Sequence, residues 1–151
     1  MKKKFLAILY WILNLTWGIL MTFIGLLVTG FVIIFLHGKP HRNGWSYIVE
    51  IGHNWGGLEL GAVALCARYS DRYPRSFDNV RKHEFGHSIQ NIIWGPFFPF
   101  VIGIPSAIRY WYREYLHKHH KPITTDYDAI WFEGQATGWG TKIVDWIEEE
   151  K

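Results

Sequence analysis

The sequence predicts an α+β protein in which an N-terminal transmembrane helix precedes a small domain of one β-hairpin and three helices. Three observations predict this class. A long uncharged stretch lies near the N-terminus. Two short segments rich in Ile, Val and Leu follow it, separated by glycines. The remainder contains segments that begin at capping residues and end at Gly-Pro or Lys-Pro, as helices do.

Length and composition exclude several classes of protein. The chain of 151 residues is 49% hydrophobic and 18% aromatic, which is too apolar for a disordered tail and too short for two domains. The net charge of +3 equals the contribution of Lys2, Lys3 and Lys4, so no basic surface for nucleic acid is expected. The single cysteine, Cys66, excludes an intramolecular disulfide framework and a cysteine-based zinc cage.

The uncharged N-terminal stretch is expected to cross a membrane. It covers the 32 residues from Phe5 to Leu36, of which 25 are hydrophobic. As one helix it would be about 48 Å long against about 30 Å of hydrocarbon, so we expect it to tilt, protrude or break near Gly18, Gly25 or Gly30. The alternative is a cleavable signal peptide, whose apolar core would be much shorter.

The flanking charges indicate an orientation. Three lysines precede the stretch, whereas Lys39 and Arg42 follow it, and this favours a cytoplasmic N-terminus. We therefore expect residues 1–37 to form a cytoplasmic basic end and a membrane anchor. Residues 38–151 would then form an extracytoplasmic domain.

Two strands are expected at the start of this domain, after a turn-rich stretch at residues 38–44. Tyr47–Ile51 and Leu58–Cys66 are rich in Ile, Val and Leu, and Asn54, Gly56 and Gly57 separate them. This pattern predicts that the two segments pair as a β-hairpin.

Three helices are expected in the remainder of the chain. The first is capped by Asp78 or Asn79 and ends before residue 95. The second begins at a Ser106 cap and extends to about residue 119, with an aromatic and basic surface that suits either a membrane interface or packing on the domain. The third covers residues 127–150, after a cap at residues 124–126.

An apolar segment at residues 92–108 separates the first two of these helices. It carries no charge, but three prolines and Gly103 interrupt it. A continuous transmembrane helix is therefore not expected there. The segment is predicted to be re-entrant, interfacial or a buried crossover of the domain.

The first helix carries a metal-binding motif. His83 and His87 are four residues apart in the pattern His-Glu-x-x-His, so both imidazoles lie on one helix face and can bind the same zinc ion. Glu84 lies beside the open position of that ion, where it can accept a proton from bound water. Gln90 and Ile93 stand where a metzincin would have Gly and His. The alternative is a pair of surface histidines with a solvated glutamate.

A catalytic zinc ion needs a third protein ligand, and Glu133 is the best candidate. It lies on the predicted last helix in an apolar, small-residue stretch, where a lone carboxylate needs a stabilising partner. The alternative is a glutamate on the helix surface. Asp126 and Asp128 are better explained as helix caps, and His117, His119 and His120 as a solvated run at a helix end.

This set of two histidines and a later glutamate resembles that of the gluzincins, the thermolysin-like class of zinc metallopeptidases. The resemblance implies a zincin-like domain with the three ligands above and Glu84 as the general base. In that class an Asp four residues after the ligand Glu supports a histidine ligand, whereas this chain has Thr137 there. We therefore expect that support from another residue, such as Asp78 or Asp128.

The chain also looks like a group of small bacterial membrane proteins of unassigned activity. This similarity covers about residues 45 to 143 and implies a metal site at a bacterial cell membrane without naming a substrate. It rests on residues 54–61 (NWGGLELG), 83–91 (HEFGHSIQN), 95–96 (GP), 104–106 (IPS) and 131–137 (WFEGQAT).

Together these observations predict a membrane-anchored zinc-dependent hydrolase, most simply a small metallopeptidase. Its expected partners are the lipid bilayer and a peptide or protein, which could add to a sheet edge at residues 58–65. Arg109, Tyr127 and His53 are candidates for stabilising the transition state. The alternatives are a non-catalytic membrane protein with a structural zinc site, for which His53 could be the fourth ligand, and an interaction protein without metal.

The metal hypothesis also constrains the topology. If residues 92–108 crossed the bilayer, His87 and Glu133 would lie on opposite sides of it and could not share an ion. The segment is therefore expected to return to the side from which it came.

Overall fold

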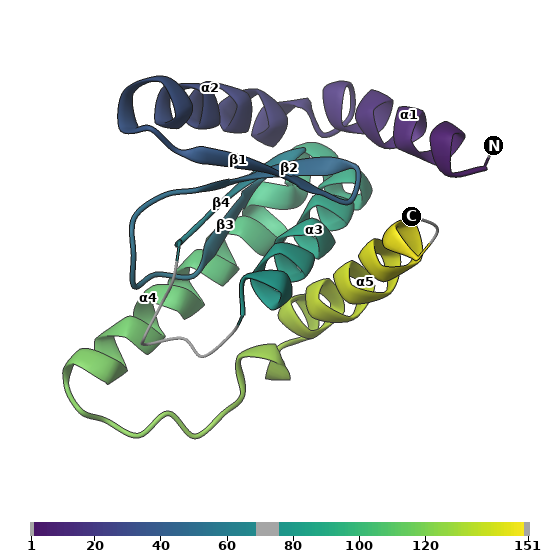
Figure 1. Cartoon of the computed structure of the whole chain (residues 1–151). Coiled ribbons are helices and arrows are strands. Elements are labelled where there is room, and N and C mark those ends of the chain that lie inside the picture. The colour runs from purple at the N-terminus through teal and green to yellow at the C-terminus, as the bar shows by residue number, and fades with distance from the viewer. Residues whose placement is uncertain (1, 69–75, 150–151) are drawn as a thin grey trace.

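A computed structural model describes residues 2–68 and 76–149, and this part of the chain folds as an α+β unit with five α-helices and a four-stranded sheet (Figure 1). The predicted α+β class is therefore confirmed. The elements are α1 (Lys2–Leu15), α2 (Ile19–Leu36), β1 (Lys39–Asn43), β2 (Ser46–Glu50), β3 (Gly57–Leu60), β4 (Val63–Cys66), α3 (Phe77–Trp94), α4 (Ile104–Lys118) and α5 (Trp131–Glu148).

The N-terminal apolar stretch forms two helices, α1 and α2, so it does not continue as one helix from residue 5 to residue 36 and the expected break occurs. The break is at Gly18, one of the three expected positions. The side-chain amide of Asn91 donates hydrogen bonds to the Gly18 carbonyl (3.2 Å) and to Asn14 Oδ1 (2.9 Å). A Cβ atom at Gly18 would lie 2.4 Å from Asn91 Nδ2, so this contact requires glycine.

Among the helices of the described residues, α2 is the one continuous helix long and apolar enough to cross a membrane, with a mean hydropathy of 2.8 over its 18 residues. One side of it packs on the sheet, where Gly25 approaches Leu60 so closely that a Cβ atom would lie 2.1 Å from the Leu60 carbonyl oxygen. The other side is exposed and carries Phe23, Leu27 and Phe35. The helix therefore combines an apolar outer face with a face buried on the domain.

Helix α1 packs on the same domain as α2 does. Tyr10 is buried, stacks on Phe85 of α3 with a ring separation of 5.7 Å, and donates a hydrogen bond to Ser88 (2.9 Å). In Figure 1, α1 and α2 follow each other across one side of the sheet. Both ends of α2 thus adjoin the domain, and this packing offers no support for an N-terminus and a domain on opposite sides of a membrane.

The sheet has the strand order β1-β2-β4-β3 and contains two hairpins. β1 pairs with β2, and β3 pairs with β4, both antiparallel, whereas β2 and β4 are parallel. The predicted hairpin of residues 47–51 with 58–66 is therefore wrong. Residues 47–50 pair in parallel with 63–66, and the segment from 58 to 66 folds back on itself. The reversal is at Gly61, whose φ of +79° favours glycine.

The stretch at residues 38–44, expected to be turn-rich, contains β1 and only one turn. Its turn residue is Gly44, with φ of +59°, which joins β1 to β2. Strand β3 lies at one edge of the sheet, so only the part of the predicted edge at residues 58–60 is at an edge. One face of the sheet packs on α2 through Val49 and Leu65, and the other packs on α3 through Ile48 and Ala64.

Helix α3 ends at Trp94, before Gly95 as predicted, but its N-cap is Ser76 and not Asp78 or Asn79. The Ser76 hydroxyl accepts a hydrogen bond from the Asn79 backbone N–H (3.3 Å). Asp78 instead forms ion pairs with Arg81 and Lys82, so its side chain is not available as a cap.

The apolar segment after α3 turns sharply. A 3₁₀ turn at residues 95–97 and a π-helical turn at 99–103 join α3 to α4, and the helix direction bends by 118° between them. The prediction that no continuous helix forms there is confirmed, and the bend returns the chain to the domain.

Of the last two helices, α4 begins earlier than predicted and α5 begins later. α4 starts at Ile104, so Ser106 lies in its first turn and is not its cap. A short 3₁₀ turn (η3, Tyr127–Ala129) precedes α5, which starts at Trp131 and not at residue 127. Asp126 and Asp128 therefore do not cap α5, although Asp126 is the residue before η3.

Helices α3 and α5 pack with their backbones in contact, and glycines make this possible. A Cβ atom at Gly86 would lie 1.9 Å from the Ala136 carbonyl oxygen, and one at Gly140 would lie 1.8 Å from that of Lys82. This contact brings the two histidines of α3 next to the glutamate of α5.

Candidate metal centre

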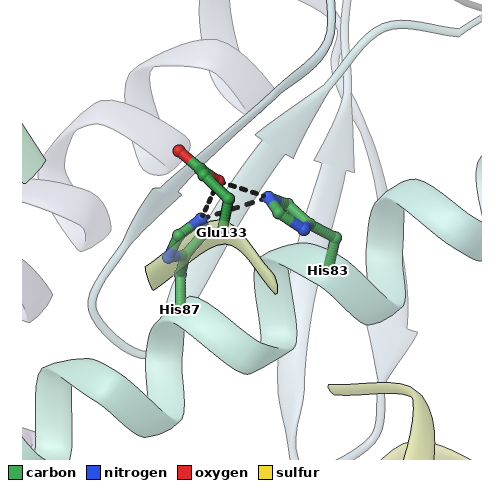
Figure 2. Close-up of side chains that lie close together, drawn as sticks. All are labelled: His83, His87 and Glu133. Carbon is green, nitrogen blue, oxygen red and sulfur yellow. Dashed lines mark hydrogen bonds and ion pairs between the residues drawn. The ribbon is translucent and has the colours of Figure 1, made fainter. Parts of the chain in front are cut away.

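His83, His87 and Glu133 meet at one point between α3 and α5 (Figure 2). Each histidine Nε2 atom lies 3.1 Å from Glu133 Oε2, and the two Nε2 atoms lie 3.1 Å apart. All three side chains are buried, and Glu133 is 0% exposed. The three residues that sequence spacing and composition selected are therefore brought together, in a geometry that could bind a metal ion.

Two polar side chains orient the imidazoles through their Nδ1 atoms. Nδ1 of His87 lies 2.7 Å from Gln90 Oε1, and Nδ1 of His83 lies 2.8 Å from Thr137 Oγ1. Gln90 Nε2 donates to the carbonyl oxygen of Phe132 (2.8 Å), which fixes the orientation of this amide because a carbonyl accepts only. Gln90 Oε1 must then accept a hydrogen bond from His87 Nδ1.

This tautomer leaves an excess of acceptors at the centre. With its proton on Nδ1, neutral His87 presents a lone pair at Nε2, where it faces the carboxylate of Glu133 and the Nε2 atom of His83. Converging acceptors in a buried site need a cation between them. A proton or a metal ion would meet this need, and two imidazoles with one carboxylate are the ligand types of a zinc site.

The charge of Glu133 is stabilised inside the protein. Burial alone would raise the pKa of this carboxyl, but hydrogen bonds with His83 and His87 hold it well below its usual range. Its second oxygen, Oε1, accepts a hydrogen bond from the Ser106 hydroxyl (2.6 Å). Burial alone would lower the pKa of His87, and the hydrogen bond with Glu133 raises it instead. Glu133 is therefore an ionised carboxylate with one oxygen directed at both histidines and the other bound by Ser106 of α4.

A cavity of about 570 Å³ opens beside the centre, and His83, Glu84 and His87 form part of its wall. Glu84 is only 5% exposed and packs under Gly57 of β3, where a Cβ atom would lie 2.2 Å from Glu84 Oε1. The predicted general base thus lies on the same cavity wall as the histidines, where it can reach a molecule that enters.

The three candidates for stabilising the transition state, Arg109, Tyr127 and His53, lie in different surroundings. Tyr127 lines the cavity, and its ring lies 5.8 Å from that of His83. The guanidinium of Arg109 donates to the backbone oxygens of Asp126 (2.7 Å) and Tyr127 (3.0 Å), so it supports the loop. His53 is exposed and does not belong to the ligand group, so it is not the fourth ligand of a closed structural site among the described residues.

Sequence reasoning missed four residues that act on the site. From the sequence, Ser106 is predicted to be a helix cap, Gln90 marks a departure from the metzincin motif, and Thr137 stands where a supporting Asp is expected. Thr137 in fact occupies that supporting position itself, so the expected substitute from Asp78 or Asp128 is not what orients the histidines. The signal was present, because a hydroxyl accepts from Nδ1–H as a carboxylate does.

Glu59 is the fourth missed residue. It lies on β3, lines the cavity and is 6% exposed, yet neither carboxyl oxygen has a hydrogen-bond partner among the described residues. Burial raises the pKa of this carboxyl well above its usual value, and the nearby charge of Glu84 raises it further. A lone Glu in an apolar strand was the available signal.

A scan against protein-family models and searches of curated proteins and of solved structures found no match. The chemistry of the site is therefore inferred from its geometry.

Proposed function

We propose that this protein is a zinc-dependent hydrolase at a bacterial cell membrane, most simply a gluzincin-like metallopeptidase in which α2 contacts the lipid. The observation that carries the proposal is the convergence of three buried candidate ligand atoms, from His83, His87 and Glu133, beside a cavity whose wall includes both histidines and Glu84. Three protein ligands beside an open space are typical of catalytic zinc sites, whereas structural sites usually have four.

In such a reaction, Glu84, Thr137 and Gln90 would have separate roles. A bound zinc ion would polarise the substrate carbonyl and lower the pKa of a water molecule to about 7. Glu84 would accept the proton of that water at its carboxylate and pass it to the leaving amine. The lining around Glu84 is mostly apolar, which would strengthen electrostatic interactions there once a substrate displaced water. Thr137 and Gln90 keep both Nε2 atoms directed at the centre.

Elemental analysis of the detergent-solubilised protein tests the ligand set. We expect about one zinc ion per wild-type chain. His87→Ala and Glu133→Ala should lose it, whereas Glu149→Gln, an exposed control, should keep it. Retention of stoichiometric zinc by Glu133→Ala would show that the third ligand is elsewhere.

Hydrolysis assays then test the role of Glu84. Glu84→Gln should retain zinc and lose at least a hundredfold in kcat on any peptide that the wild type cleaves. Unchanged kcat in this variant would exclude Glu84 as the base. A zinc-loaded wild type that cleaves no peptide or amide would instead identify a structural or binding site.

A further inference from the structure

The cavity beside the metal centre is apolar over most of its wall. Its lining includes Met21, Trp55, Leu58, Phe98, Ile102 and Trp111. The acidic residues among the described lining residues are Glu59 and Glu84, and no lysine or arginine is among them. Such a wall favours an uncharged apolar group and disfavours a phosphate or carboxylate.

The cavity lies at the level of the apolar helix α2. Met21 of α2 forms part of its wall, together with residues of the bent segment between α3 and α4. On the outside, the same bent segment and α4 expose large apolar side chains, among them Phe97 (60%), Phe100 (69%) and Ile108 (64%). Exposed apolar side chains around an apolar cavity mark a surface that contacts lipid or an apolar partner.

An edge strand borders the same cavity. Gly57, Leu58 and Glu59 of β3 line it, and β3 is paired on one side only, with β4. The other side of an edge strand presents backbone N–H and C=O groups to a passing chain. A peptide can use these groups, whereas a lipid acyl chain cannot.

We propose that this cavity binds an uncharged apolar side chain of a peptide, from a segment that lies at the membrane surface. The inference rests on the proposed function, since it names the substrate class of that site. Three observations carry it together: the apolar wall without a cation, the position against α2, and the adjoining strand edge. An anionic lipid is disfavoured because Glu59 and Glu84 line the cavity and no lysine or arginine is among its described lining residues.

A pair of matched variants tests the cavity directly. Ala107 lines the cavity and is exposed, so Ala107→Trp places an indole in it without overpacking the core. Ile108→Trp places the same group on the outer face one residue later. For a peptide with Leu next to the scissile bond, Ala107→Trp should lower kcat/KM at least tenfold, mainly through KM, and Ile108→Trp should change it less than twofold. Both should retain zinc.

The wild-type protein should also cleave the Leu peptide at least tenfold more efficiently than one with Asp at that position. Equal cleavage of the two peptides would overturn the inference, and so would an Ala107→Trp variant that behaves like Ile108→Trp. Either result would leave the proposed hydrolase intact, because it would show hydrolysis with another specificity.

A second measurement does not depend on activity. A peptide with a photoreactive apolar side chain is irradiated with the Glu84→Gln protein in detergent, and the modified residues are mapped by mass spectrometry. We expect crosslinks at Met21, Leu58 or Ile104, competed by the Leu peptide and lost in Ala107→Trp. Crosslinks at these positions without hydrolysis of any peptide would overturn the proposed function and support this inference. Labelling by a photoreactive phospholipid that the Leu peptide does not compete would overturn the inference in favour of a lipid.

Discussion

Glu133 and Glu59 are both buried glutamates beside the same cavity, but their surroundings differ. Glu133 is 0% exposed, contacts two imidazoles and accepts a hydrogen bond from Ser106. Glu59 is 6% exposed and has no hydrogen-bond partner among the described residues. The pKa of the first is held low, and the pKa of the second is raised. Partners, and not burial, decide which carboxyl group is charged inside this protein.

The largest expected effect comes from replacing the carboxyl group of Glu133 by an amide, and the same replacement at Glu59 is the comparison. Glu133→Gln should weaken zinc binding at least a thousandfold, because a few ligands supply about 10–16 kcal/mol in protein zinc sites. Glu59→Gln should change zinc affinity less than threefold, because it belongs to no ligand group. Competition with a chelator measures both. Equal losses in the two variants would show that the comparison is wrong and that Glu59 is itself a ligand.

The next largest effect concerns the packing of α3 against α5, which brings Glu133 to His83 and His87. Gly140→Ala should destabilise the fold by about 2–3 kcal/mol, because the new Cβ atom would lie 1.8 Å from the Lys82 carbonyl oxygen. Gly138 has nothing within 4 Å, so Gly138→Ala should stabilise α5 by up to about 1 kcal/mol. Urea denaturation in detergent measures both. The opposite order of the two stabilities would contradict the close contact of α3 and α5.

The orientation of the ligands has a smaller effect. Thr137→Val keeps the shape of the side chain but removes the acceptor of His83 Nδ1–H, so zinc affinity should fall about 10- to 100-fold. Thr141→Val, on an exposed position of the same helix, is the control and should bind zinc as the wild type does. Unchanged affinity in Thr137→Val would show that the hydroxyl does not orient His83.

Taken per pH unit, the smallest effect is the pH dependence of stability that Glu59 imposes. Because its pKa is raised in the folded state, its contribution to stability is fully present below the unfolded value of about 4.5 and is lost as the pH rises towards the folded value. Glu59→Gln should reduce this loss, by at most about 1.4 kcal/mol per pH unit. Unfolding free energies measured from pH 5 to 8 test this. The exposed control Glu149→Gln should follow the wild type, and a Glu59→Gln curve parallel to it would contradict the raised pKa.

The same contrast explains what the sequence could predict. His83 and His87 are local to one helix, so their spacing alone placed both imidazoles on one face. Glu133 was selected because a carboxylate in an apolar stretch needs a partner. Glu59 presents the same signal in an apolar strand, but it has no motif around it, and only the fold shows that it faces the cavity.

The errors in the predicted fold concern contacts between distant residues. β2 pairs with β4 in parallel, whereas two strand-like segments with a short glycine-rich link predict an antiparallel hairpin. The break at Gly18 could be placed only approximately, because it depends on Asn91, 73 residues later. Ser106 precedes a helical pattern and reads as a cap, but its hydroxyl bonds to Glu133, which only the bend between α3 and α4 makes possible.

Because of that bend, α4 is connected to the site differently from α3 and α5. The three candidate ligand atoms come from α3 and α5, whose backbones are in contact, whereas α4 reaches Glu133 through the Ser106 hydroxyl. A rotation of α4 about the turns at residues 95–103 would therefore lengthen the Ser106–Glu133 bond while α3 and α5 kept their contact. Because α4 also exposes Trp111, a load on this exposed face would act on the hydrogen bond of one carboxylate oxygen. The relative positions of His83, His87 and Glu133 would then depend less on α4 than the basicity of Glu133 does.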